Sequence, residues 1–259
     1  MTPLSPVPRL GAACASIDGV NTWFAAKGVA ELGLKVALSG VGGDELFQGY
    51  GHFRTIPPLV RWARRGSALP GGDAVLEAVA KAQARRTGNA KWRSAPRELR
   101  SLAGALRLRR GLFAPDLLPE LMGPERARLA VVRAQETPDE LALSNIGPAR
   151  ALSYLETTGY LRNQLLRDAD WTSMAHGVEL RTPLCDIDLL HTLAPYLEQL
   201  GSRPAKLLLA EAADLPPLIA QRPKVGFAVP VTTWLGELGR VSSAHPTQGW
   251  AKVIGAAFA

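Results

Sequence analysis

The segment that most constrains the fold of this chain covers residues 36–50 and reads V-A-L-S-G-V-G-G-D-E-L-F-Q-G-Y. A short apolar run ends in a glycine-rich turn, and two carboxylates and a helical pattern follow it. This order predicts a strand over residues 35–38, a loop whose backbone can approach a ligand closely, and then a helix. The uninterrupted apolar run is typical of a strand that is buried on both faces of a parallel sheet.

The turn within this segment has two chemical interpretations. Asp44 can simply cap the helix that follows it. Alternatively, the backbone amides of Gly40, Gly42 and Gly43 suit a phosphate group, but the carboxylates of Asp44 and Glu45 would repel a bare anion. A phosphate ligand at this turn therefore needs Mg²⁺ or nearby lysine and arginine side chains.

Helical periodicity dominates the rest of the sequence. Ser16 or Asp18 is expected to cap a first helix, which Gly33 ends. Pro57 and Pro58 are expected to stop the helix that follows the glycine turn. With one convincing strand among about nine predicted helices, the chain is expected to be mostly α-helical, with a remnant of an α/β parallel sheet.

The composition is that of a globular protein, because 259 residues of which 47% are hydrophobic can bury a core. No apolar stretch approaches the ~20 residues that cross a bilayer, and the first residues lack the apolar core of a signal peptide. Cys14 and Cys185 are far apart, and the histidines have no metal-ligand spacing. These features predict a location in the reducing cytoplasm and no membrane partner.

The net charge of +7 comes from one part of the chain. Residues 81–110 hold ten lysines and arginines against one acid, Glu98. Such a segment can bind nucleic acid or an acidic partner, or it can be the solvated surface of a helix pair. Trp92 is the one aromatic residue within it and no nucleic-acid motif accompanies it, so nucleic-acid binding is the less favoured interpretation.

Four segments, in order, resemble the asparagine-synthetase family. The glycine turn and the residues after it resemble one family signature, and S-I-D-G-V-N-T (residues 16–22) fits its lead-in. Residues 167–186, R-D-A-D-W-T-S-M-A-H-G-V-E-L-R-T-P-L-C-D, are similar to the family stretch D-x-x-S-M-A-x-x-x-E-x-R-x-P-x-x-D. Lys206 followed by R-P-K-V-G-F-A-V-P (residues 222–230) resembles its C-terminal basic motif. Together the matches extend from residue 16 to residue 235.

The resemblance implies a fold and a division of the chain. The fold would be an incomplete Rossmann-like synthetase domain of the adenine-nucleotide-hydrolase type, joined to a helical bundle. Residues 1–15 would be an irregular N-terminal segment, residues 16–238 a partial asparagine-synthetase-like domain, and residues 239–259 a divergent C-terminal tail.

The resemblance also implies an activity. The family's synthetase domain binds ATP and Mg²⁺, adenylates the carboxylate of an acid substrate, and uses ammonia from glutamine to form an amide. The chain is therefore expected to be part of a glutamine-hydrolysing asparagine synthase-type ligase, acting on aspartate or another acid. Two alternatives remain open: a catalytically inactive truncated remnant or interaction module, and a basic helical nucleic-acid binder.

Residue by residue, the resemblance assigns catalytic roles to Asp44, Arg181 and Lys206. Asp44 would orient Mg²⁺ or the ammonium group of the substrate, and the two cations would neutralise charge on the phosphates. For Arg181 the alternative is an ion pair with Glu179 or Asp186. Further cofactor contacts would come from Ser39, Gly40, Gly42, Gly43, Glu45 and Lys224, although Lys224 could equally be a surface lysine.

The sequence also departs from the family pattern. The phosphate loop S-G-G-x-D-S does not occur in it, and position 2 is not the cysteine of a glutaminase domain. Val41 stands where asparagine synthetases usually have Glu, and Trp171 stands where many members have a basic residue. These departures predict an incomplete enzyme that is inactive alone and that lacks its glutaminase portion.

A further expectation concerns the strand. In the family, the strands that complete its sheet lie before the part that begins at residue 16. Residues 36–38 and the helix of residues 17–32 are therefore expected to leave an exposed apolar patch.

Overall fold

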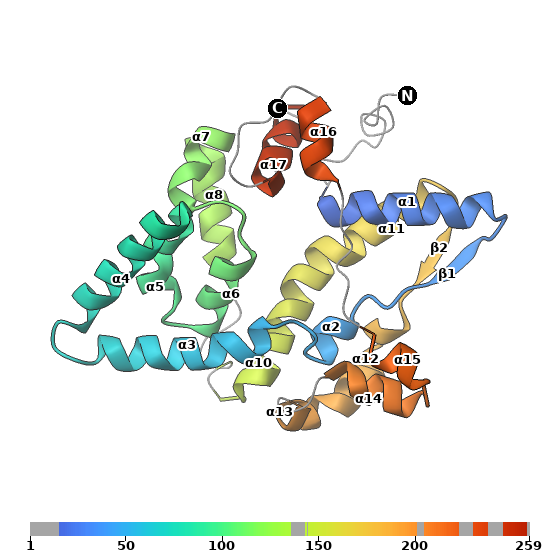
Figure 1. Cartoon of the computed structure of the whole chain (residues 1–259), viewed down its shortest axis with the longest axis horizontal. Coiled ribbons are helices and arrows are strands. Elements are labelled where there is room, and N and C mark those ends of the chain that lie inside the picture. Colours follow the sequence, from blue (N-terminus) through green and yellow to red (C-terminus); the bar gives the residue numbers. More distant parts are fainter. Residues whose placement is uncertain are drawn as a thin grey trace. The chain divides into compact units, whose positions relative to one another are not determined.

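The computed structural model describes residues 16–135, 143, 145–200, 205–222, 230–237 and 246–257. These residues are mostly helical and contain one small parallel sheet of two strands (Figure 1). No helix among them is both long enough and apolar enough to cross a membrane.

The chain divides into two compact units. The first, called the sheet unit here, comprises Met1–Phe47, Glu156–Pro195 and Pro204–Ala259, and the second, the bundle unit, comprises Gln48–Leu155 and Tyr196–Arg203. Each unit combines segments that are distant in the sequence.

The described elements of the sheet unit are α1 (Ile17–Glu31), β1 (Val36–Leu38), α2 (Gly43–Leu46), the π-helix η4 (Thr157–Leu165), α11 (Leu166–Met174), β2 (Glu179–Arg181), η5 (Pro183–Cys185), α12 (Ile187–Leu193), α14 (Ala205–Ala212), α15 (Pro217–Ala220), α16 (Val231–Glu237) and α17 (Pro246–Ala257). Helix α1 begins as predicted, with Ser16 as its N-cap, and Gly33 follows its end in a left-handed conformation. Helix α1 packs along α11.

The sheet pairs β1 with β2 in parallel, so that Ala37 is the register partner of Leu180. Sequence reasoning predicted β1 but missed β2. The chain reaches β2 because Gly177, with φ of +63°, ends the helical run, and the buried Val178 then leads into an extended segment. Only three residues pair on each strand, too few to produce a clear period-2 pattern in the sequence.

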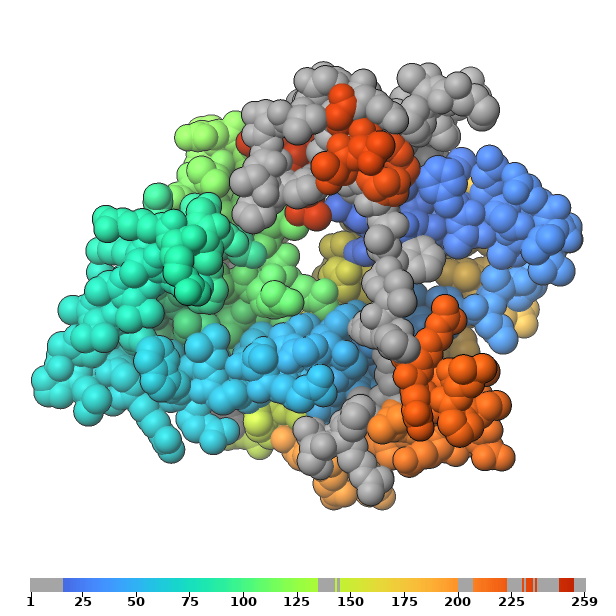
Figure 2. All heavy atoms as spheres, viewed as in Figure 1, coloured from blue at the N-terminus to red at the C-terminus, as the bar shows by residue number. Residues whose placement is uncertain are grey.

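The prediction that β1 is buried on both faces is wrong. Ala37 and Leu180 are half-buried, whereas Val36 is 41% and Leu38 is 77% exposed. Leu32, at the end of α1, is 76% exposed. The predicted exposed apolar patch is therefore confirmed; Figure 2 draws the segment that carries it, residues 17–38, in blue. The physical reason is that β1 has one strand neighbour among the described residues.

The other end of α1 is covered by the C-terminal part of the chain. Trp250 of α17 is 3% exposed and packs with Ile17 and Val20 of α1 and with Trp234 of α16. The expected divergent tail thus contributes a buried aromatic side chain to the sheet unit. Sequence reasoning missed α17, although an aromatic residue in an otherwise small and apolar segment is a signal of burial.

The described elements of the bundle unit are α3 (His52–Ser67), α4 (Gly72–Thr87), η2 (Ala90–Ser94), α5 (Ala95–Glu98), α6 (Leu102–Arg110), η3 (Pro115–Leu117), α7 (Leu118–Met122), α8 (Pro124–Gln135), α10 (Pro148–Glu156, whose last residue belongs to the sheet unit) and α13 (Leu197–Leu200). The short η6 (Ala194–Tyr196) spans the boundary between the units. Leu152 is fully buried in the core of the bundle unit, which α3, α4, α5, α6 and α10 line.

Two helix boundaries differ from those predicted. Pro57 and Pro58 lie inside α3 and do not end it, because the helix buries a continuous apolar face that includes Ile56 and Val60. The helix expected to begin at Asp44 instead divides into α2 and α3.

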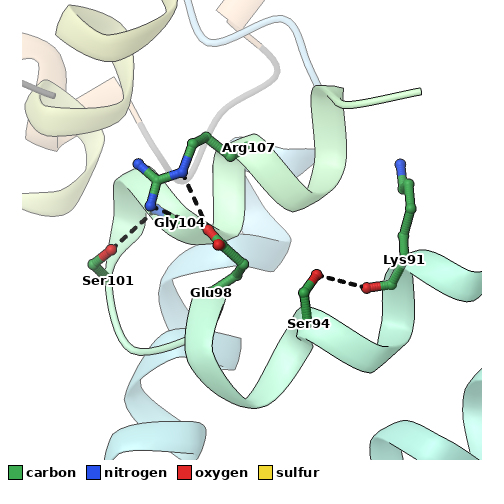
Figure 3. A network of polar contacts seen from close by, with 6 residues as sticks. All are labelled: Lys91, Ser94, Glu98, Ser101, Gly104 and Arg107. Atoms are coloured by element: carbon green, nitrogen blue, oxygen red, sulfur yellow. Dashed lines mark hydrogen bonds and ion pairs between the residues drawn. The ribbon is translucent and has the colours of Figure 1, made fainter. Parts of the chain in front are cut away.

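Residues 95–110 form two helices, α5 and α6, with a break between Glu98 and Leu102. The Oγ atom of Ser101 accepts a hydrogen bond from the Gly104 amide and caps α6 (Figure 3). Across this break, the guanidinium of Arg107 pairs with the carboxylate of Glu98 at 3.1 Å. A Cβ atom on Gly104 would collide with the Glu98 carbonyl, so the glycine permits the close turn between the two helices.

Replacement of Trp250 by alanine is expected to lower the free energy of unfolding of the sheet unit by about 3–5 kcal/mol, the usual cost of removing a buried aromatic side chain. Trp62→Ala is the matched control, because Trp62 is exposed on α3, and it should cost less than about 1 kcal/mol. Urea unfolding followed by circular dichroism measures both values. Equal, small effects of the two substitutions would show that α17 does not belong to the folded core.

Candidate functional site

The candidate site is the glycine turn, residues 39–43, which connects the carboxyl end of β1 to α2. The Ser39 amide donates to the Arg181 carbonyl at 2.8 Å and extends the strand ladder by one bond. The Val41 amide donates to Ser39 Oγ at 3.3 Å, and the Gly43 amide donates to the Gly40 carbonyl at 3.2 Å. Hydrogen bonds within the turn therefore already engage two of its amides.

Gly42 and Gly43 pack tightly against η5. Gly42 has φ of +94°, and a Cβ atom there would lie 2.7 Å from Cys185 Sγ. A Cβ atom on Gly43 would lie 2.9 Å from Leu184 Cδ1. These two glycines are thus needed for a left-handed backbone and for contact with another segment of the protein. Gly40 differs, because it is exposed and has open space beside its Cα atom.

The contact between η5 and the turn was not foreseen. Cys185 Sγ donates a hydrogen bond to the Val41 carbonyl at 3.4 Å. Burial, and to a smaller extent the negative charge of Glu45, raises the pKa of this thiol. The thiol is therefore a neutral packing group that holds the turn in place.

The two carboxylates of the turn have different surroundings. Asp44 is half-buried in the first turn of α2, which has only four residues; the N-cap of this helix is Gly42, so the prediction that Asp44 caps it is wrong. Glu45 is 1% exposed, inside the sheet unit. A ligand at the exposed Gly40 side of the turn could therefore approach Asp44 more easily than Glu45.

Arg181 lies beside the turn, because it is the register partner of Leu38 at the end of β1. Its side chain is exposed, and Nε donates to Glu179 Oε1 at 2.9 Å. The ion pair with Glu179, one of the two alternatives that the sequence left open, is therefore present. Exposed pairs of this kind are weak, so an anionic ligand could replace Glu179 as the partner of Arg181.

The two lysines of the predicted site cannot be placed. Lys206 belongs to α14, and its side chain lies outside what the structure describes; Lys224 lies wholly outside the described residues. The structure therefore brings Arg181 to the glycine turn, and the convergence of Lys206 on the same place stays a prediction.

A metal ion at this site would need ligands from elsewhere. Within the described part of the chain, no three His, Cys, Asp or Glu side chains come together as a metal-binding group. Asp44 could supply one carboxylate to Mg²⁺ whose other ligands are phosphate oxygens and water, the usual coordination of Mg²⁺ with nucleotides.

A second polar cluster lies where α1 begins against α11, and sequence reasoning missed it. The buried carboxylate of Asp168 accepts hydrogen bonds from Ser16 Oγ and, at 3.3 Å, from Trp171 Nε1. Beside it, Asp18 Oδ2 accepts hydrogen bonds from Tyr160 at 2.6 Å and from Gln164 at 2.9 Å. The indole of Trp171 is therefore hydrogen-bonded within the protein.

The basic segment of the bundle unit forms an open groove of about 550 Å³. Arg100 pairs with Asp73 at 2.9 Å, and Lys81 pairs with Glu77 at 3.5 Å. Two of the basic side chains of the groove are therefore matched by acids of α4. This arrangement favours the solvated helix surface over a nucleic-acid site.

Because Gly42 packs against Cys185 in a left-handed conformation, we expect Gly42→Ala to lower the free energy of unfolding by at least about 2 kcal/mol. Backbone strain and overpacking both contribute to this loss. Gly40→Ala, at the open position of the same turn, should change it by less than about 0.5 kcal/mol. In the double variant Gly42→Ala/Cys185→Ala the contact with the sulfur should be relieved, whereas the close contact with the Leu184 carbonyl and the backbone strain should remain. Chemical denaturation measures the free energy of unfolding of all three variants. Equal effects of Gly42→Ala and Gly40→Ala would show that the packing of Gly42 against η5 does not contribute to stability.

The pKa of Asp168 is raised from its ordinary value of 3.8, chiefly by burial. The folded state therefore holds this proton more tightly than the unfolded state. Its contribution to stability is complete below pH 3.8 and is lost as the pH rises through the raised pKa of the folded state. Because Asn cannot ionise, Asp168→Asn should gain stability relative to the wild type as the pH rises.

The measurement is the free energy of unfolding of both proteins between about pH 3.5 and pH 7. Asp170→Asn, at an exposed position of the same helix, is the control and should show a nearly constant difference from the wild type. A constant difference for Asp168→Asn as well would contradict the raised pKa.

Comparison with known proteins gives a consistent family. The sequence matches the family model described as asparagine synthase over residues 10–244. The glutamine-hydrolysing asparagine synthetase 1 of Bacillus subtilis (strain 168) is 27% identical over 223 residues, which are 83% of this chain and 34% of that protein. A Mycobacterium bovis protein provisionally named as a glutamine-hydrolysing asparagine synthetase is 29% identical over 235 residues, 79% of this chain and 31% of that protein.

The chain thus spans about a third of the length of these curated relatives. No solved structure matches it. Because the family model covers residues 10–244, nearly the whole sequence, the chain belongs to the asparagine synthase family.

Proposed function

We propose that this chain is part of an ATP-dependent amidotransferase that adenylates a carboxylate and then forms an amide with ammonia from glutamine. The observation that carries the proposal is the position of the glycine turn at the carboxyl end of β1, with Arg181 directly beside it. Open α/β sheets bind their ligands at this end of their strands.

The same observation supports a fold for the whole enzyme. In our proposal, β1 and β2 are part of a larger parallel, Rossmann-like sheet, and residues 16–238 form the portion of the synthetase domain that this chain contributes. Residues 1–15 and 239–259 would flank it. The short crossover-linked parallel pair supports this view, since purely parallel sheets rarely consist of two strands with open faces.

In the proposed reaction, each residue has a separate task. The exposed side of the turn at Gly40, with Ser39, would contact the nucleotide, and Asp44 would supply a carboxylate to Mg²⁺ that ATP brings. Arg181, with Lys206 and Lys224, would neutralise the negative charge that develops during adenylate transfer. ATP supplies the energy, and the protein positions the acid and stabilises charge.

The substrate is an acid, aspartate or another carboxylate. Val41 replaces a carboxylate that most asparagine synthetases carry in this turn, and its peptide carbonyl is held by Cys185. A valine side chain cannot assist the acyl-adenylate step, which favours an acid other than aspartate. We also propose that a glutaminase portion supplies the ammonia.

The chain alone is expected to form no AMP or pyrophosphate from ATP above background when supplied with Mg²⁺, ammonia and aspartate. Positioning of the phosphates supplies much of the rate of such reactions, and the phosphate loop of the family does not occur in these 259 residues. An assay of pyrophosphate release tests this expectation. Acid-dependent release by the 259-residue chain would contradict this expectation.

The proposed function is tested in a chimaera, in which the matched segment of the Bacillus subtilis relative is replaced by this chain. We expect acid-dependent AMP formation, and a loss of about 100-fold or more in kcat for Arg181→Gln, as for removal of a transition-state charge contact. Glu179→Gln, the matched control, removes the other half of the ion pair and should keep activity. Equal losses would mean that the pair is only structural.

Asp44 is tested in the same chimaera. Because Gly42 and not Asp44 is the N-cap of α2, Asp44→Asn removes no cap; it keeps the shape of the side chain and removes its charge. A loss of about 100-fold in kcat is expected if the carboxylate acts on Mg²⁺ or substrate. Full activity of this variant would assign Asp44 a structural role alone, and an inactive parent chimaera would favour an interaction module over an enzyme.

A further inference from the structure

Helix α4 of the bundle unit has apolar residues on two sides, and the structure covers one of them. Leu76, Ala80 and Ala84 repeat every four residues and are buried, and α4 packs against α3, α5 and η2. A second apolar set is exposed and is called the α4 stripe here: Ala74, Val75, Ala78, Val79 and Ala82. A helix with apolar residues beyond its core-facing side normally buries these residues as well.

The α4 stripe is continuous and uncharged. Its members follow the three- and four-residue spacing of neighbours on a helix surface. Val75 is 60% and Val79 is 51% exposed. The acids of this helix, Asp73 and Glu77, lie on another side, where they line the open groove. The stripe is therefore an apolar surface with no charged residue inside it.

Two arginines follow the stripe at the C-terminal end of α4. Arg85 comes seven residues after Ala78, and Arg86 comes seven residues after Val79, so both continue the same face of the helix. Both side chains are exposed, and neither forms an ion pair with a carboxylate of the described residues. The positive charge at this end of the stripe is therefore available to an acidic partner.

We propose that the α4 stripe docks an acidic amphipathic helix of another protein, whose apolar side covers the valines and alanines and whose carboxylates pair with Arg85 and Arg86. Rows of side chains four residues apart interdigitate with those of a second helix, and alanines allow a close approach. The stripe belongs to the bundle unit and the glycine turn belongs to the sheet unit, so docking needs none of the residues of the proposed reaction.

The charge of the protein selects this occupant over a second copy of the chain. The bundle unit holds 19 lysines and arginines against 10 acids, a net charge of +9, whereas the sheet unit holds 11 against 13. Two bundle units in contact would repel each other, whereas an acidic segment is attracted before it docks.

A membrane surface suits the stripe less well than a helix does. Helices that lie on membranes carry Trp, Phe or Leu on their apolar side, and the stripe consists of alanine and valine. Nucleic acid offers phosphates to the two arginines, but it has no apolar face to cover Val75 and Val79.

The probe is a synthetic helical peptide of about 18 residues, long enough to cover α4 at about 1.5 Å per residue. It has leucine on one side and glutamate elsewhere, and a second peptide has glutamine at every glutamate position. Fluorescence anisotropy of the labelled peptides with the 259-residue chain measures the dissociation constants. We expect the acidic peptide to bind at about 1–100 μM, as for a small interface, and the glutamine peptide to bind about tenfold more weakly or worse.

Val79→Glu tests the stripe itself. It places a carboxylate in the middle of the apolar surface, so the affinity for the acidic peptide should fall by about tenfold or more. Leu129→Glu is the matched control, because Leu129 of α8 is 50% exposed and the substitution adds the same charge; it should bind as the wild type does. Circular dichroism checks that both variants fold, and Val75→Glu replaces Val79→Glu if the latter does not.

The double variant Arg85→Gln/Arg86→Gln tests the basic end of the stripe. At low salt it should bind the acidic peptide about tenfold more weakly and the uncharged glutamine peptide as well as the wild type does. Arg126→Gln/Arg128→Gln removes the same charge from exposed positions of α8 and should change the affinity for the acidic peptide by less than about twofold.

Three peptide results would overturn the proposal: no binding of the acidic peptide, equal binding of the glutamine peptide, and equal effects of Val79→Glu and Leu129→Glu. Self-association in analytical ultracentrifugation that Val79→Glu abolishes would instead assign the stripe to a second copy. Binding of phosphatidylserine vesicles or of single-stranded DNA that this variant abolishes would assign it to a membrane or to nucleic acid.

Discussion

The parallel backbone ladder between β1 and β2 is the interaction on which the candidate site depends. It joins a segment near residue 37 to one near residue 180 and places the Ser39 amide on the Arg181 carbonyl. Closing so large a loop costs entropy, and the contacts of α1 along α11 help to offset it. Without this ladder, the glycine turn and Arg181 would have no fixed relation.

The glycine turn is shaped more by packing than by openness to a ligand. Gly42 and Gly43 leave room for Cys185 and Leu184, so most of the glycine content serves the contact with η5. Gly40 is the position that faces open space. In the proposed function, the turn therefore contributes only Ser39 and Gly40 to the nucleotide contacts.

The acidic side chains of the two units have different partners. In the bundle unit, acids of α4 and α5 pair with arginines and a lysine of the basic segment, and the pair of Glu98 and Arg107 spans the break between α5 and α6. In the sheet unit, the carboxylate of Asp168 is buried and accepts hydrogen bonds from Ser16 and Trp171. The first arrangement stabilises a solvated surface, and the second fixes the start of α1 against α11.

The sequence by itself determined the features that depend on neighbouring residues. Ser16 caps α1, Gly33 and Gly177 end helices, and Val36 to Leu38 are extended, because capping, left-handed glycine and local apolar runs are short-range effects. The tertiary structure alone decided that Pro57 stays inside α3, since burial of a long apolar face outweighs a local preference. It also decided the pairing of β2 and the docking of Trp250 on α1, because three paired residues give no clear pattern, an aromatic side chain indicates burial but not its partner, and both contacts join residues far apart in the sequence.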